Sequence, residues 1–239
     1  MPYTRRATAF VAGATGYTGR EVVRLLVKRG ARVVAHVRSD SPRLAEWRQR
    51  FAAMGAETDA TPWEPAAMRG ALARVDPTHL FALLGTTRKR ERAEGRDGAA
   101  GYEAVDYGLT SLLVKAARAA GTRPRVVYLS AAGVGPGSRN AYVAVRWRME
   151  EELRASGLPF VIARPSFITG ADREERRPTE RVLAAAADRL LALPAALGGG
   201  HFADRWRSLT ATQLATALVR LAFDPEAEGR TVDASEMRT

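Results

Sequence analysis

The chain has 239 residues, 46% of them hydrophobic, which is enough apolar material for one sizeable core but too little for two full domains. It contains no cysteine, so disulfides, thiolate metal sites and cysteine nucleophiles are excluded, and we expect a cytoplasmic protein. Its net charge of +11 comes from 37 basic and 26 acidic residues, and all but three of the basic residues are arginine, which favours biased residue usage over a nucleic-acid partner.

Runs of β-forming apolar residues alternate along the chain with segments of helical periodicity. This alternation predicts an α/β fold, a doubly wound Rossmann-type parallel sheet flanked by helices, in a single domain of residues 1–239. The expected strands cover residues 7–12, 32–37, 80–84, 125–129 and 160–163, with a last strand at 230–234.

Three of the helical segments end at a glycine, which suits the left-handed conformation at a helix C-terminus. They cover residues 19–30, 107–121 and 146–157. Near the end of the chain, Thr210 and Gln213 form the pattern of a capping box before an apolar helix.

Neither a membrane span nor a metal site is expected. The best apolar run, residues 182–197, is shorter than the ~18 residues that a span needs and is interrupted by charges and a proline. The three histidines, His36, His79 and His201, are scattered without ligand spacing, so a structural or exposed position is the better interpretation of each.

Three glycines, Gly13, Gly16 and Gly19, lie at the turn from the first predicted strand into the first predicted helix. One glycine permits a tight turn, another lets the backbone approach a pyrophosphate, and the third lets the helix pack closely on the strand. The N–H groups and the dipole at the start of the helix would then face the anion. A glycine triplet alone also fits a plain turn, but its place between strand and helix favours a dinucleotide site.

The end of the second predicted strand bears on which dinucleotide binds. An acid at this place binds the ribose 2′-hydroxyl of NAD, whereas an arginine accommodates the 2′-phosphate of NADP. The segment "VVAHVRSD" ends in Arg38, with Arg20 and Arg43 elsewhere in the same predicted region, so we expect NADP. Asp40 leaves NAD possible, and a solvent-facing Arg38 is the plainer alternative.

Several motifs together resemble one family. They are "GATGYTGREVVRLL", "LLGTTR", "AVDYGLTSLLVKAARAAG", "VVYLSAAG" and "ARPSFITGADREERRPTE". These resemble the atypical NAD(P)-binding branch of the short-chain dehydrogenase/reductases, and within it the Tat-interacting-protein-like group. The resemblance implies a small substrate-side region at about 166–210. The cofactor contacts that the glycine turn and the resemblance predict are Gly13, Thr15, Gly16, Tyr17, Thr18, Gly19, Arg38, Gly85, Thr86, Thr87, Asp106, Pro165, Ser166 and Phe167.

The resemblance also implies a serine, a tyrosine and, four residues after the tyrosine, a lysine that holds the nicotinamide ribose and favours the ionised tyrosine. Ser130 and Tyr142 match the first two, but the third position is Arg146. Arginine keeps the positive charge but replaces a compact ammonium with a planar fork. We therefore expect slow turnover that rises on Arg146→Lys. Without the resemblance, Tyr142 is an ordinary residue of an amphipathic helix.

Two classes of function follow. The first is an NADP-dependent oxidoreductase acting on a small carbonyl compound, with Tyr142 as general acid, Ser130 polarising the carbonyl and Arg146 in the place of the lysine. The second is a cofactor-binding redox sensor or interaction module without turnover, which the departure at Arg146 favours. In both, the expected partners are small molecules and no metal is involved.

Overall fold

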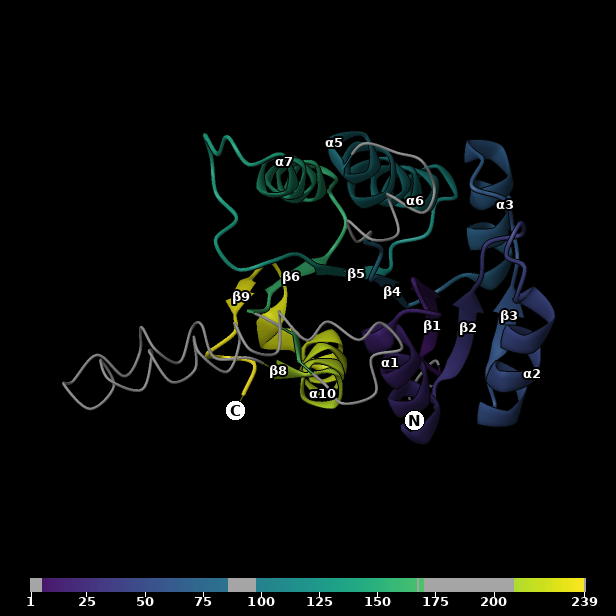
Figure 1. Cartoon of the computed structure of the whole chain (residues 1–239). Coiled ribbons are helices and arrows are strands. Elements are labelled where there is room, and N and C mark those ends of the chain that lie inside the picture. Colours follow the sequence, from purple (N-terminus) through teal and green to yellow (C-terminus); the bar gives the residue numbers. More distant parts are fainter. Residues whose placement is uncertain (1–5, 86–97, 167, 170–208, 239) are drawn as a thin grey trace.

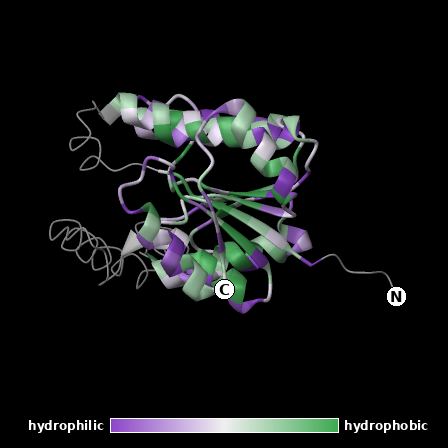
Figure 2. Ribbon diagram, turned by 90° about the vertical axis from the view of Figure 1, so that its right-hand side faces the viewer, coloured by the Kyte–Doolittle hydropathy of each residue, from purple (hydrophilic) through white to green (hydrophobic). Residues whose placement is uncertain are grey.

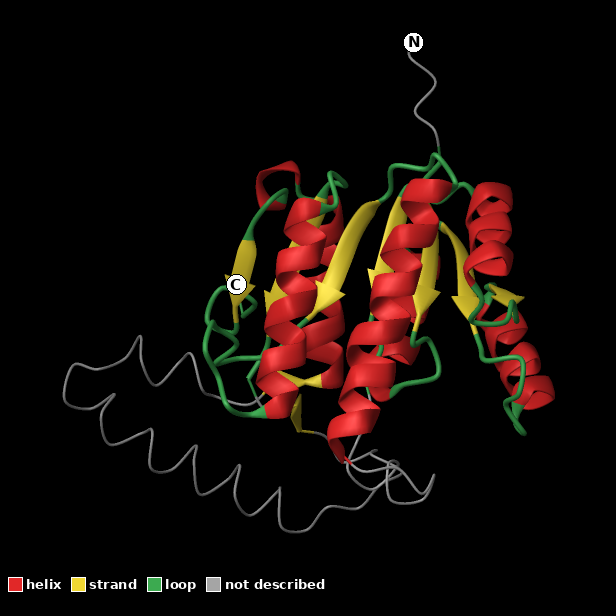
Figure 3. Ribbon diagram, turned by 90° about the horizontal axis from the view of Figure 1, so that it is seen from above, coloured by secondary structure: helices red, strands yellow, loops and turns green. Residues whose placement is uncertain are grey.

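The computed structural model describes residues 6–85, 98–166, 168–169 and 209–238. Within these residues, seven parallel strands form one sheet in the order β3-β2-β1-β4-β5-β6-β9 (Figure 3). The chain winds outward in both directions from the β1–β4 pair, which confirms the predicted doubly wound architecture. The strands are β1 (Thr8–Ala12), β2 (Arg32–His36), β3 (Glu57–Asp59), β4 (His79–Ala82), β5 (Arg125–Leu129), β6 (Phe160–Arg164) and β9 (Thr231–Asp233).

Helices cover both faces of the sheet (Figure 1). On one face lie α1 (Tyr17–Lys28), α2 (Leu44–Met54) and α10 (Ala211–Phe223). On the other lie α3 (Pro65–Val75), α6 (Thr110–Ala119) and α7 (Ala141–Ala155). The shorter elements are α5 (Gly98–Gly101), the π-helix η1 (Tyr102–Leu109), the 3-10 helix η2 (Pro225–Ala227) and a parallel pair of β7 (Ile168–Thr169) and β8 (Leu209–Thr210).

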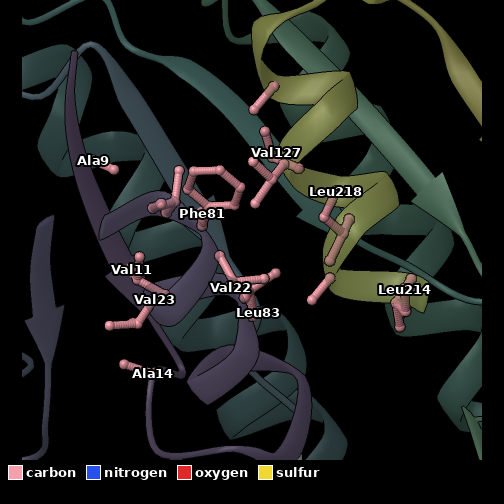
Figure 4. Close-up of a cluster of buried hydrophobic side chains, with 14 of the residues drawn as sticks. Ala9, Val11, Ala14, Val22, Val23, Phe81, Leu83, Val127, Leu214 and Leu218 are labelled. Atoms are coloured by element: carbon pink, nitrogen blue, oxygen red, sulfur yellow. The ribbon is translucent and has the colours of Figure 1, made fainter. Parts of the chain in front are cut away.

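The central strands are apolar on both faces because a helical layer covers each face of the sheet, as Figure 2 shows. In β1, Ala9 and Val11 face the α1–α10 layer, whereas Phe10 and Ala12 face the opposite layer. Figure 4 shows side chains of α1 and α10 meeting over the sheet. Two separate hydrophobic clusters therefore hold the sheet between them.

The predicted strands are confirmed to within two residues at each end. Strand β3 was not predicted, because its three residues are polar and only partly buried at the sheet edge. Helix α7 begins five residues before the predicted start, since the Asn140 side chain accepts the N–H groups of Tyr142 and Val143 at 3.0 and 3.3 Å. The capping box of Thr210 and Gln213 is confirmed.

Candidate cofactor and catalytic site

The predicted glycine turn lies at the carboxyl end of β1, where the sheet order changes direction. Gly13 has a φ of +85°, and a Cβ atom there would lie 2.5 Å from the carbonyl oxygen of Leu83. A Cβ atom at Gly19 would lie 2.1 Å from the carbonyl oxygen of Gly13. Both positions exclude a side chain because backbone already occupies the space.

The start of α1 fits an anionic group. Gly16 is the N-terminal cap and offers no side chain to accept the first N–H groups of the helix. It is exposed, and a Cβ atom there would meet only the Gly13 carbonyl oxygen, at 3.1 Å. Thr15 and Tyr17 are half-buried beside it, whereas Thr18 packs inward. The turn can therefore approach a pyrophosphate through its backbone.

Three arginines surround Trp47 of α2, and two of them, Arg43 and Arg50, pair with Glu46 at 2.7 Å. The guanidinium carbons of Arg20, Arg43 and Arg50 lie 5.9, 5.1 and 5.2 Å from the ring centroid of Trp47 in α2. Arg38 follows β2, is exposed, and lies 3.6 Å from a carboxylate oxygen of Asp40. Arginine and acid are thus both present at the position that distinguishes the two dinucleotides.

Beyond β4, the chain connects the glycine turn with the predicted catalytic residues. The Leu83 N–H donates to the Ala12 carbonyl at 3.0 Å, and a guanidinium nitrogen of Arg146 donates to the carbonyl of Leu84 at 3.4 Å. Gly85 comes next and is exposed. The predicted Thr86, Thr87 and Phe167, and most of the region 166–210, lie outside the described residues.

Arg146 is buried in a network rather than extended toward solvent. Its Nη2 lies 2.5 Å from Oδ1 of Asp106, and its Nη1 donates to the carbonyl of Leu129 at the end of β5. Its guanidinium carbon lies 5.1 Å from the ring centroid of Tyr142 and 5.7 Å from that of Tyr128. The predicted Tyr142 and Arg146 therefore do come together, and Asp106 joins them.

The electrostatics of this cluster keep Arg146 charged. Burial on its own would lower the pKa of Arg146, but Tyr142, Tyr128 and Asp106 outweigh it and raise that pKa above its ordinary value. Burial raises the pKa of Tyr128 to about 12 despite the nearby guanidinium. The site thus holds a permanent cation between two tyrosine rings.

The Ser130 hydroxyl belongs to a different hydrogen-bond network from that of Arg146. Its hydroxyl donates to Oε1 of Glu150 at 2.6 Å, and both residues are buried. Glu150 also accepts from Arg164, at 2.9 and 2.6 Å, and from Arg154 at 2.9 Å. Pro165 is buried, and its carbonyl accepts the N–H of Ala132 at 2.8 Å, while Ser166 is half-buried. In the described residues, the Ser130 hydroxyl is therefore committed to this neighbouring ionic network.

Comparisons with known proteins identify the family of this chain. The family described as NAD(P)H-binding matches residues 13–188, which include the glycine turn, Asp106 and Arg146. The chain belongs to the NAD(P)H-binding family. Two fungal members are fmp52-1 of Aspergillus terreus, 31% identical over 179 residues that cover 73% of this chain and 72% of the relative, and fmp52 of Aspergillus clavatus, 33% identical over 177 residues that cover 73% and 71%.

Solved structures share the fold of this NAD(P)H-binding chain. The UDP-glucose 4-epimerase of Brucella ovis in complex with NAD matches with a TM-score of 0.65 and 20% identity, covering 97% of this chain and 80% of the epimerase. The UDP-Glc/GlcNAc 4-epimerase of Campylobacter jejuni matches with a TM-score of 0.68 and 14% identity, covering 97% and 82%. At these identities the likeness establishes the Rossmann-like, epimerase-like architecture.

The expected cytoplasmic location is wrong by the same comparison, because the fungal relatives are named mitochondrial proteins. The absence of cysteine fits a reducing compartment but contains no targeting information, so it could not distinguish the cytoplasm from the mitochondrion. Among the helices that the structure describes, none is long and apolar enough to cross a membrane.

Residue patterns missed some partners of the side chains in this candidate site. The segment "RMEEELR", residues 148–154, predicts surface ion pairs along a helix, and Arg154 does pair with Glu150 and Glu151. Glu150, however, is fully buried and accepts a hydrogen bond from Ser130. The sequence feature that could have indicated the inward position of Glu150 is its spacing of eight residues from Tyr142, which places both on one side of α7. His36 is buried and its Nε2 lies 2.9 Å from the Thr61 carbonyl oxygen, a structural position as expected. The described residues contain no group of three or more side chains arranged for a metal.

Proposed function

We propose that this NAD(P)H-binding protein is an NADP(H)-dependent oxidoreductase that acts on a small carbonyl compound, in the Tat-interacting-protein-like branch of the atypical short-chain dehydrogenase/reductases. One observation carries the proposal. The guanidinium of Arg146 is fixed 5.1 Å from the Tyr142 ring at the carboxyl edge of the sheet, on the same side as the glycine turn. A tyrosine beside a permanent cation is suited to give and take a proton.

The residues of the candidate site have separate roles in the proposed reaction. The turn that contains Gly13, Gly16 and Gly19 would hold the pyrophosphate, which would approach the backbone at Gly16, and the bound cofactor would supply or accept the hydride. Tyr142 donates a proton to the carbonyl oxygen, and the charge of Arg146 stabilises the tyrosinate that remains. Because the Ser130 hydroxyl donates to Glu150, its contacts give the predicted polarising role no support.

The preference for NADP is part of the proposal. Arg38, with Arg20 near Trp47, would provide charge for a 2′-phosphate. Asp40 lies 3.6 Å from Arg38, and Glu46 pairs with both Arg43 and Arg50. Binding titrations should show Arg38→Ala weakening NADPH selectively, with NADH unchanged, and Asp40→Asn leaving NADPH binding intact or tighter. A native protein that binds NADH as tightly, and loses it in Asp40→Asn, would reverse the assignment.

A cofactor-binding protein without turnover is the second candidate. It is favoured by the engagement of Arg146 with Asp106, Leu84 and Leu129, which leaves its fork turned toward protein acceptors rather than a ribose. The commitment of Ser130 to Glu150 points the same way. In this case the site senses or stores NADP(H).

A screen of NADPH oxidation over aldehydes, ketones and quinones tests the two candidates. Tyr142→Phe should lower turnover by about 10²- to 10⁴-fold while NADPH still binds. An ammonium cannot span the acceptors of the Arg146 fork, so Arg146→Lys should now lower turnover, the opposite of the expectation from sequence. If the protein saturated with NADPH reduces no compound in the screen and Arg146→Lys is equally inert, the second candidate is correct.

A further inference from the structure

A buried carboxylate lies directly behind the cation of the candidate site. Asp106 and Arg146 are 40 positions apart in the sequence, yet the exposed fractions of their side chains are only 0% and 5%. We infer that Asp106 is a positioning residue, which holds the charge of Arg146 against Tyr142. This inference rests on the proposed function, because it assigns Asp106 a part in that reaction through Arg146.

The position of the guanidinium is set from three directions. Asp106 accepts from Nη2 at 2.5 Å, the Leu84 carbonyl accepts from the same nitrogen at 3.4 Å, and the Leu129 carbonyl accepts from Nη1. Leu84 lies two residues after β4 and Leu129 is the last residue of the neighbouring strand β5, so the fork bridges the carboxyl edge of the sheet. Asp106 provides the charged acceptor, and a charge-assisted bond is stronger than one to a neutral carbonyl.

The helix that carries Asp106 is unusual. Residues 102–109 form the π-helix η1, which continues into α6, and π-helical turns occur frequently at functional sites. Asp106 is the buried residue of this helix, whereas Glu103 on the same helix is exposed and pairs with Arg148. A buried carboxylate is costly unless it is paired, so its inward direction requires the partner that Arg146 supplies.

Gly85 leaves room for this pair. A Cβ atom at Gly85 would lie 3.0 Å from Nη2 of Arg146 and 3.5 Å from Oδ1 of Asp106. A side chain there would press on the pair. Gly85, predicted from sequence to line the cofactor, therefore also lies against the ion pair.

The order of the contacts separates positioning from direct catalysis. Tyr142 lies against Arg146 and, at 5.2 Å between ring centroids, against Tyr102 of η1. Asp106 accepts from Nη2 of the guanidinium and is fully buried. Asp106 thus acts on Tyr142 through Arg146, and without Asp106 an unpaired buried cation would move toward water.

The test uses the full chain labelled with ¹⁵N-arginine and ¹³C-tyrosine and read by nuclear magnetic resonance. The Arg146 side-chain signal is assigned by its loss in Arg146→Lys, and the Tyr142 ring signal by its loss in Tyr142→Phe. In the native protein the Arg146 N–H groups should exchange slowly with water and show proximity to the Tyr142 ring. In Asp106→Ala, both the protection and the proximity should be lost in a protein that still folds.

Two variants keep the outcome clear. Asp106→Asn preserves the size of the side chain and one acceptor oxygen, so it should fold even if Asp106→Ala does not. It should lose part of the protection of the Arg146 N–H groups from exchange. Glu103→Ala, which removes the exposed ion pair of the same π-helix, should leave Arg146 unchanged. Retention of the Arg146–Tyr142 proximity in folded Asp106→Ala overturns the inference. If Asp106→Ala does not fold, undiminished protection of the Arg146 N–H groups in Asp106→Asn overturns it.

Turnover gives the second measurement. Asp106→Ala should lower kcat as much as Arg146→Met does, because the first change displaces the guanidinium from Tyr142 and the second removes it. The double variant should then show no further loss. Additive losses would mean that Asp106 does not act through Arg146. Absence of turnover, or turnover insensitive to Arg146→Met, would count against the proposed function, while the magnetic resonance result still decides the role of Asp106.

Discussion

Single atoms decide which positions of the glycine turn tolerate a side chain. At Gly13 and Gly19, backbone oxygens would lie 2.5 and 2.1 Å from an added Cβ atom, whereas Gly16 is exposed and its nearest contact would be at 3.1 Å. The first and third glycines therefore serve the packing of α1 against the strand ends. Gly16 remains the position at which a ligand can approach the backbone.

At this scale we predict opposite effects for two glycine-to-alanine changes. Gly19→Ala should lower the free energy of unfolding by about 1 to 3 kcal/mol, because the backbone must shift to admit the methyl group. Gly70→Ala, on the exposed side of α3 with no atom within 4 Å, should raise it by roughly 0.5 to 1 kcal/mol. Urea unfolding of both variants checks this, and equal effects would contradict it.

Helix α7 is the element that assembles the candidate site. Tyr142, Arg146 and Glu150 follow one another at intervals of four residues, so they share one side of the helix. The first lies toward the helix start, the second bridges β4 and β5, and the third binds Ser130 and Arg164. The placement of the helix start therefore controls the placement of Tyr142.

We predict that two helix caps of similar strength differ in their effect on function. Asn140→Ala and Thr210→Ala each remove a side chain that accepts N–H groups at a helix start, so each should cost about 1 kcal/mol of stability. Only Asn140→Ala frees the Tyr142 N–H, and only it should reduce turnover. Thermal unfolding and NADPH oxidation measure the two effects, and an equal loss of turnover in both variants would refute the distinction.

In the whole molecule, one sheet lies between the two helical layers. The candidate site lies at the carboxyl ends of the strands, and charged side chains also lie at their amino ends. There, His79 at the start of β4 lies 4.3 Å from the Phe223 ring between centroids, and Arg125 donates to the carbonyls of Ala222 and Asp224 at 3.2 and 2.6 Å. Burial, and then the charge of Arg125, lowers the pKa of His79 from 6.5 to about 4. The folded state therefore favours the neutral form of His79.

The preference of the folded state for neutral His79 predicts how the free energy of unfolding responds to acid. Between pH 6.5 and about 4 the unfolded chain binds a proton at His79 that the folded chain does not, so stability is complete above pH 6.5 and falls as the pH is lowered through this range. The loss should reach about 2 kcal/mol, less than the full shift implies because the ring is only half-buried.

Denaturant unfolding at several pH values, with His79→Gln as the comparison, measures this loss. Burial also lowers the pKa of His36, so part of the slope should remain in His79→Gln. An identical slope in His79→Gln and the native protein would show that His79 does not contribute.

Local residue patterns were sufficient to predict the alternation of strands and helices, the glycine turn and the capping box of α10. These features depend on periodicity and turn chemistry, which neighbouring residues carry wherever the chain folds. The same patterns place Tyr142 and Arg146 four residues apart, and a helix then brings them onto one side.

The contacts of these side chains, by comparison, depend on the packing of the folded chain. Arg146 meets Asp106 from 40 positions away, and Ser130 meets Glu150 rather than Tyr142. Strand β3 forms from polar residues because β2 offers it a parallel edge. Such contacts follow from how whole elements pack, and a buried polar group takes the nearest partner that packing provides, which residue spacing along the chain does not encode.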